Sequence, residues 1–158
     1  MIADLENIVC EAIRVFNEQE RYLIENDLSE LCVCARFAMT LSEILRHTQY
    51  KEYIVDVEYN RGIDGSERAI KRLCDAIIVV DLIVHKRGYD CKYGSDNLIC
   101  IEMKKLKNRR GCMSDEDRLK KMTACNYGFC YKLGVMLIID DELNIIKIKN
   151  KFSNGTQI

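Results

Sequence analysis

With 158 residues, 48% of them hydrophobic and 31% charged, the chain has the composition of one globular domain with a substantial core. The formal net charge of −1 argues against a protein that coats nucleic acid through its overall charge, although it allows a local basic surface. We find no apolar run of 18 residues and no secretory leader pattern, so we expect neither a membrane span nor export. Nine scattered cysteines then indicate a reducing, cytoplasmic environment in which they act as small hydrophobic residues.

Apolar residues at helical spacing predict two helices before the first strand. The first covers residues 2–24 and has a candidate break near Asn17, and the second runs from Asp27, as its N-cap, to about residue 47. Glu30 follows Asp27 by three residues, which is the spacing of a capping box. Glu30 also falls on the apolar face of this helix, so a functional carboxylate beside the sheet is the alternative interpretation.

Short β-branched segments bounded by turn residues predict strands at residues 52–59, 76–85 and 97–105. Two of these segments contain the most apolar runs in the sequence, yet both carry charge. Asp81 interrupts the first run, and Glu102 and Lys104 close the second. Since side chains alternate along a strand, Glu102 and Lys104 share one face, and Asp81 joins them if the two strands pair.

The segments around these strands carry weaker signals. Glu58 ends the first strand, where it is either solvated or close to Asp81 and Glu102. The glycine- and serine-containing stretch 62–73 predicts a mobile connection or a short helix from Ser66.

The last part of the chain begins with a dense basic run. Residues 104–110 contain five lysines and arginines in seven positions, which predicts either a solvated surface or contact with a phosphate backbone. A capping-box pattern from Ser114 opens a helix over 115–125, and two strands follow. We expect these strands at residues 133–139 and 145–149. The domain then covers 1–152, with 153–158 as a loose tail.

The charged residues within the apolar runs require a compensating partner. A buried, unpaired carboxylate costs several kcal/mol, so Asp81 and Glu102 are expected to be neutralised. A divalent metal is one such partner, because Mg²⁺ binds through one or two carboxylates and completes its coordination with water and phosphate oxygens. A lysine at position 104 would then stabilise the charge that develops on a phosphate during displacement.

These residues carry a resemblance to a known family. Asp81 on one strand, followed by Glu102-Met103-Lys104 on the next, resembles the motif of the PD-(D/E)XK nuclease superfamily. The resemblance implies an α/β fold with a restriction-endonuclease-like αβββαβ core, in which helices flank a mixed central sheet. It also implies metal-dependent phosphodiester hydrolysis, with Asp81 and Glu102 as ligands of Mg²⁺ or Mn²⁺, Lys104 as the catalytic lysine and Glu30 as an additional carboxylate. Two departures are visible: Val80 replaces the family's proline, and the interval from Asp81 to Glu102 is long.

The sequence therefore predicts a metal-dependent nuclease, with DNA as the expected nucleic acid and Glu58 as a further candidate metal ligand. The predicted nucleic-acid contacts are basic residues near the motif: Lys105, Lys107, Arg109, Arg110 and Arg61. The alternative is a catalytically inactive module that retains the nuclease fold and acts as a homodimer or within a larger complex. The choice between DNA and RNA, and between endonuclease and exonuclease, is left open.

Overall fold

A computed structural model describes the whole chain except residues 65–66, 71, 74–75, 88–95 and 109–111. Its centre is a mixed sheet of six strands, which lie in the order β1 (Ile54–Val57), β6 (Leu82–His85), β7 (Asn97–Lys105), β8 (Leu133–Asp140), β9 (Ile145–Ser153) and β10 (Thr156–Gln157). β7 and β8 are parallel, and the other neighbours are antiparallel. The predicted α/β class with a mixed sheet flanked by helices is confirmed.

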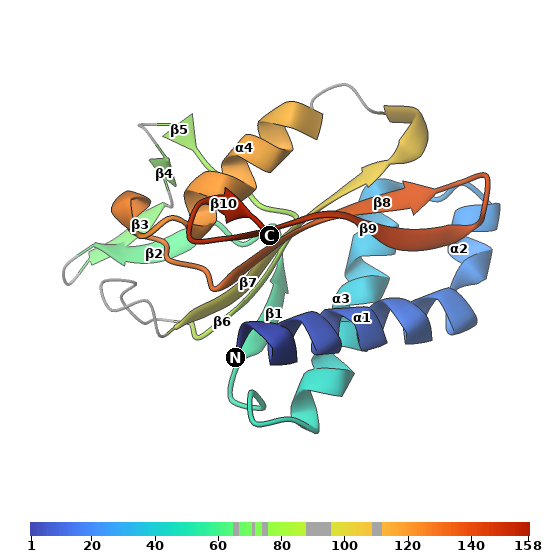
Figure 1. Ribbon diagram of the computed structural model, residues 1–158, viewed down its shortest axis with the longest axis horizontal. Helices are drawn as coiled ribbons and strands as arrows, with labels where there is room; N and C mark the ends of the chain where they lie inside the picture. The colour runs from blue at the N-terminus through green and yellow to red at the C-terminus, as the bar shows by residue number, and fades with distance from the viewer. Residues whose placement is uncertain (65–66, 71, 74–75, 88–95, 109–111) are drawn as a thin grey trace.

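Helices cover both faces of this sheet (Figure 1). On one face lie α1 (Ile2–Gln19), α2 (Arg21–Glu25) and α3 (Glu30–Arg46), and on the other lies α4 (Cys112–Thr123). Parallel neighbours need a crossover connection, and α4 supplies it between β7 and β8. Short 3₁₀ turns follow β7 and α4, at Leu106–Asn108 and Cys125–Tyr127.

The core consists of two apolar layers separated by the sheet. Alternate residues of β7 supply both layers, because successive side chains of a strand point to opposite faces. Ile101 and Met103 pack with α1 and α3, whereas Cys100 packs with Leu119 and Met122 of α4. The α4 face also contains Glu102 and Lys104, which have the same parity as Cys100. The face of β7 toward α1 and α3 is therefore apolar from Ile99 to Met103 and ends at Lys105, whereas the α4 face carries Glu102 and Lys104.

The strands predicted at 97–105 and 133–139 are confirmed, but the ends of the helices differ from expectation. The first helix breaks at Glu20, and Asn17 lies within α1. The Asn17 side-chain amide donates to the Ile146 carbonyl at 2.9 Å and accepts from the Ile146 amide at 2.7 Å, so it satisfies the backbone edge of β9. The break expected near Asn17 is therefore three residues too early; asparagine is a poor helix former, and the contact with β9 offsets that preference.

Both predicted capping boxes are wrong. The N-cap of α3 is Ser29, whose hydroxyl accepts from the Cys32 amide at 3.2 Å, whereas Asp27 lies before the helix with φ of 54°. The second helix begins at Cys112, so Ser114 lies in its first turn and does not precede it. Glu30 is therefore not used as a cap, and its carboxylate makes a long-range contact described below.

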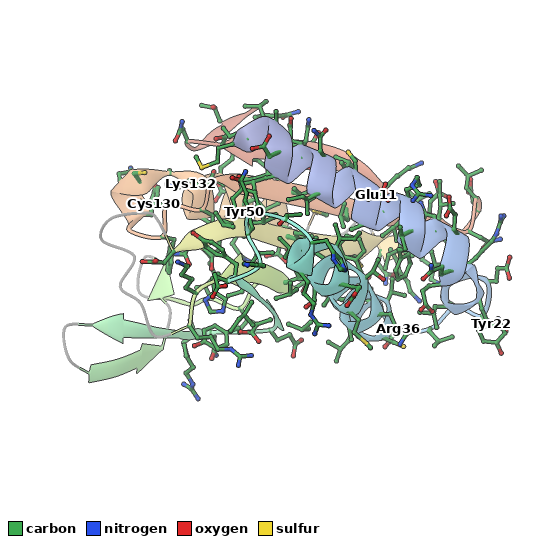
Figure 2. All side chains as sticks on the ribbon, turned by 90° about the horizontal axis from the view of Figure 1, so that it is seen from below. Glu11, Tyr22, Arg36, Tyr50, Cys130 and Lys132 are labelled. Carbon is green, nitrogen blue, oxygen red and sulfur yellow. The ribbon has the colours of Figure 1, made fainter. Side chains whose placement is uncertain are left out.

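The segment between β1 and β6 also differs from the prediction. The strand expected at 76–85 is interrupted: β5 (Ala76–Ile77) pairs with β4 (Arg72–Leu73), and β6 begins only at Leu82. The expected mobile connection or short helix contains a hairpin of β2 (Arg61–Asp64) and β3 (Glu67–Ile70). Figure 2 shows this hairpin projecting from one end of the molecule, opposite the end where Tyr22 lies.

The expectation of a loose tail from Ser153 is wrong. Thr156 and Gln157 form β10, which turns back onto the end of β9. Gly155 makes this turn with φ of 77°, and a Cβ there would approach the Ala124 Cβ to 2.9 Å, so only glycine fits. Among the described residues, no helix is long and apolar enough to cross a membrane.

Candidate active site

The candidate site is built where β6 begins beside β7. The pairing of β6 with β7 reaches Leu82, which lies opposite Ile101. Beyond that point two backbone amides of β7 donate hydrogen bonds to side-chain carboxylates instead of to a strand. The Met103 amide donates to Asp81 Oδ2 at 2.7 Å, and the Lys105 amide donates to Glu30 Oε1 at 3.0 Å. Two carboxylates from different elements thus take the hydrogen bonds that a longer β6 would have accepted. Their long-range partners explain why Asp81 and Glu30 approach each other.

Glu102 lies next to Asp81 on the α4 side of β7. Its side chain is 4% exposed, and its carboxylate is ion-paired with Arg118 of α4. Burial raises the pKa of Glu102 well above its ordinary value, and the nearby Asp81 charge raises it further, against the lowering effect of Arg118. Burial also raises the pKa of Asp81, although hydrogen bonds from Met103 and with Glu102 oppose the shift. The two predicted ligands therefore interact electrostatically in a poorly solvated place.

Lys104 is connected to the same cluster through α4. Its Nζ lies 3.7 Å from Asp115 Oδ2, and the other oxygen of Asp115 lies 3.5 Å from Nη2 of Arg118. Asp115 and Arg118 are one helical turn apart, so both side chains reach β7 from one face of α4. The sequence interpretation placed neither residue in the site. Their i, i+3 spacing was visible, but their distance from Glu102 depends on how α4 crosses the sheet.

The carboxylates open into two neighbouring cavities. A cavity of about 450 Å³ is lined by Glu30, Glu58 and Asp81, together with Ser29, Leu31, Cys34, Lys105 and Asn108. A second cavity of about 480 Å³ is lined by Glu30, Lys104, Lys107 and Asn108. Glu30 and Asn108 border both, and the Asn108 amide donates to Glu30 Oε1 at 3.3 Å. One cavity is thus mainly acidic, and the adjacent one carries two lysines.

Glu58 reaches this region because of an unusual backbone conformation. It follows β1, is exposed, and has φ of 51°, while its amide donates to the Asp81 carbonyl at 3.0 Å. Positive φ is uncommon for a residue other than glycine, and the bond to Asp81 holds the turn in place. The structure therefore places Glu58 at the acidic cavity beside Asp81, as well as in contact with solvent.

The basic residues predicted to contact nucleic acid differ in their exposure to solvent. Lys105 is the least accessible of those described, because its side chain is 8% exposed and its Nζ lies 2.6 Å from Asp27 Oδ1. Lys107 contacts the same oxygen at 2.6 Å but is about half exposed. Arg61 is exposed at the start of β2. Arg109 and Arg110 lie outside the described residues.

The donor chemistry of the site fits a hard divalent cation. Glu30, Glu58 and Asp81 offer carboxylate oxygens around one cavity, and oxygen is the donor that Mg²⁺ and Mn²⁺ prefer. Within the described parts of the chain, no group of three or more His, Cys, Asp or Glu side chains is close enough to hold one metal ion. Mg²⁺ ordinarily takes only one or two carboxylates and keeps several waters, so a cation at this cavity would need water to complete its coordination.

Comparison with known proteins found no relative. No protein-family model matches the sequence, and no match was found among curated proteins or solved structures.

Proposed function

We propose that this chain is a metal-dependent nuclease that hydrolyses phosphodiester bonds of nucleic acid, with DNA as the expected substrate. One observation carries the proposal: Asp81 and Glu30 both hydrogen-bond the open edge of β7 beside Glu102 and Lys104. These groups come from three elements that are far apart in the sequence. Convergence of one buried and two partly buried carboxylates beside a lysine and a cavity is typical of a catalytic site.

The order of elements supports the same proposal. α3, β1, β6 and β7 are followed by α4 and then by β8, which lies parallel to β7. This order agrees with the αβββαβ restriction-endonuclease-like core that the sequence resemblance implies, if β2–β5 are an insertion between its first two strands. Asp81 then precedes the second core strand, and Glu102 and Lys104 lie on the third.

The residues of the chain have separate roles in the proposed reaction. Asp81 and Glu102 would hold Mg²⁺ or Mn²⁺, assisted by Glu30 and Glu58 at the cavity wall. A bound cation would supply positive charge to a phosphate oxygen and lower the pKa of a coordinated water.

Lys104 lies close to the acidic cluster and borders the basic cavity, where its ammonium would stabilise charge developing on the phosphate. Lys107 borders the same cavity and would contact the nucleic-acid backbone without selecting a base sequence.

One observation favours a second candidate function. Arg118 already supplies a positive partner for the Glu102 carboxylate, so this carboxylate does not require a metal ion to balance its charge. A catalytically inactive module that retains the fold, acting as a homodimer or with a partner protein, would use Arg118 in this permanent way. This alternative predicts no saturable binding of a divalent cation.

The proposal is tested by incubating wild type and Lys104→Ala with linear duplex DNA, single-stranded DNA, branched DNA and RNA. Each substrate is combined with Mg²⁺, Mn²⁺ or EDTA. We expect metal-dependent cleavage of at least one substrate, reduced about 10²- to 10³-fold in Lys104→Ala. The exposed Lys51 lies outside the site, so Lys51→Ala is the matched control and should cleave like wild type.

Calorimetric titration with Mn²⁺ separates the two candidates. Saturable binding that disappears in Asp81→Ala, together with cleavage, supports the nuclease. Neither binding nor cleavage would contradict the nuclease and favour the interaction module.

A further inference from the structure

Arg118 lies among acidic side chains at the heart of the candidate site. Besides its ion pair with Glu102, its guanidinium lies 3.5 Å from Asp115 and donates to the Val79 carbonyl at 3.4 Å. The Arg118 side chain is 30% exposed, whereas those of Glu102 and Asp115 are 4% and 11% exposed. A permanent positive charge therefore enters a region of buried carboxylates from its open side.

We infer that Arg118 is an internal counter-ion that competes with a divalent cation for Glu102, so that metal binding requires Arg118 to leave that carboxylate. This inference rests on the proposed metal site. It assigns to α4 a role beyond packing, because the residue that controls the charge of the site comes from this helix. Arg118 acts through Glu102 and is a positioning residue.

The ion pairs of Arg118 place a positive charge beside two carboxylates of the acidic cluster, Glu102 and Asp115. Buried carboxylates that face one another strongly disfavour ionisation unless a positive group is close. An arginine remains charged at any accessible pH, so it cannot make room for a cation by losing its proton. It has to move, and the charge repulsion between a guanidinium and a divalent ion favours that movement.

Asp115 offers the Arg118 guanidinium an alternative ion-pair partner to Glu102. Asp115 lies one turn earlier on the same helix and already contacts both Arg118 and Lys104. A guanidinium that leaves Glu102 therefore retains a carboxylate partner. Rotation of a partly exposed arginine moves only its side chain and gives up the hydrogen bond to the Val79 carbonyl, so α4 can remain packed against the sheet, where Gly134 of β8 allows Thr123 to approach closely.

The test is calorimetric titration with Mn²⁺ at pH 8.5, which favours ionised carboxylates. The proteins are wild type, Arg118→Gln, Arg118→Lys and the control Lys121→Gln. Lys121 lies on the same helix and pairs with Asp117 at 2.7 Å, so this control removes a charge from α4 outside the cluster. We expect Arg118→Gln to bind Mn²⁺ at least tenfold more tightly than wild type. Arg118→Lys retains the charge and should stay within about threefold of wild type, as should the control.

The outcomes separate this inference from the proposed function. Equal or weaker Mn²⁺ binding by Arg118→Gln, with wild-type binding that Asp81→Ala abolishes, overturns the inference and leaves the proposed site intact. Tighter binding in both Arg118→Gln and Arg118→Lys also overturns it, because the charge would not be the cause. Absence of Mn²⁺ binding in every protein overturns both proposals.

Arg118→Gln leaves Glu102 without its cationic partner, so the folding of this variant is checked by circular dichroism with and without Mn²⁺. Recovery of the wild-type spectrum on adding Mn²⁺ supports the inference, because the cation then replaces the guanidinium. Failure to recover overturns it.

Discussion

Two buried polar clusters lie at opposite ends of β6. At its C-terminal end, His85 Nε2 lies 2.9 Å from Asp56 Oδ2 on β1, and the guanidinium of Arg87 grips both oxygens of Asp56. At its N-terminal end, Asp81 lies beside Glu102. The first cluster brings a histidine and an arginine to one carboxylate, whereas in the second the acidic side chains outnumber the basic ones.

The pKa values of the carboxyl groups in the two clusters are shifted in opposite directions. Burial alone would raise the pKa of Asp56, but hydrogen bonds from Arg87 and with His85 hold it below its ordinary value. Burial raises the pKa values of Asp81 and Glu102, and their partners do not compensate. A carboxylate whose pKa is lower in the folded than in the unfolded state contributes to stability through its charged form. A carboxylate whose pKa is higher in the folded state lowers the stability when it is charged. This contrast assigns structure to one end of β6 and proposed function to the other.

The largest effect is expected from Asp81→Asn. An asparagine can still accept the hydrogen bond from the Met103 amide but offers no charge, so metal-dependent cleavage should fall by about 10³-fold. Since a destabilised charge is removed, the free energy of unfolding at neutral pH should rise by about 0.5–2 kcal/mol. Cleavage assays and urea denaturation measure the two effects. A loss of both activity and stability would mean that Asp81 is a structural residue like Asp56.

An intermediate effect is expected from Asp56→Asn. Breaking a fully buried ion pair costs about 3–5 kcal/mol, and we expect about 2 kcal/mol here because Arg87 is half exposed. Urea denaturation measures the loss, with Asp117→Asn on the exposed side of α4 as the unaffected control. Mn²⁺ affinity should not change. A change in metal binding without loss of stability would reverse the assignment of the two clusters.

The smallest effect is expected in the pH dependence of stability. The lowered pKa of Asp56 contributes stability that is present above its unfolded value, near 3.8, and is lost as pH falls through the folded value. The raised pKa of Glu102 acts oppositely, because the folded state binds more protons: stability declines as pH rises from the unfolded value near 4.5.

Urea midpoints measured between pH 3 and 9 give the stability as a function of pH. The acid arm of this curve is the loss expected from Asp56, and the alkaline arm is the loss expected from Glu102. Asp56→Asn should flatten the acid arm, and saturating Mn²⁺ should flatten the alkaline arm. An alkaline arm that Mn²⁺ leaves unchanged would contradict metal binding at Glu102.

The sequence by itself determined the elements whose signals are local. The uninterrupted apolar runs predict β7 and β8, because a strand covered on both faces needs apolar side chains at successive positions. The cost of burying charge marked Asp81, Glu102 and Lys104 without reference to any partner. The structure brings these three residues together beside the cavities, and their roles in metal binding and catalysis stay a prediction.

Only the tertiary structure decided which groups meet. Glu30 satisfies a capping-box pattern locally, yet its carboxylate accepts from the Lys105 amide because β6 begins only at Leu82 and leaves that amide without a strand partner. Arg118 belongs to a basic stretch in the sequence, and it reaches Glu102 because α4 crosses from β7 to the parallel β8. Such partnerships depend on where elements end and cross, and contacts between distant parts of the chain decide both.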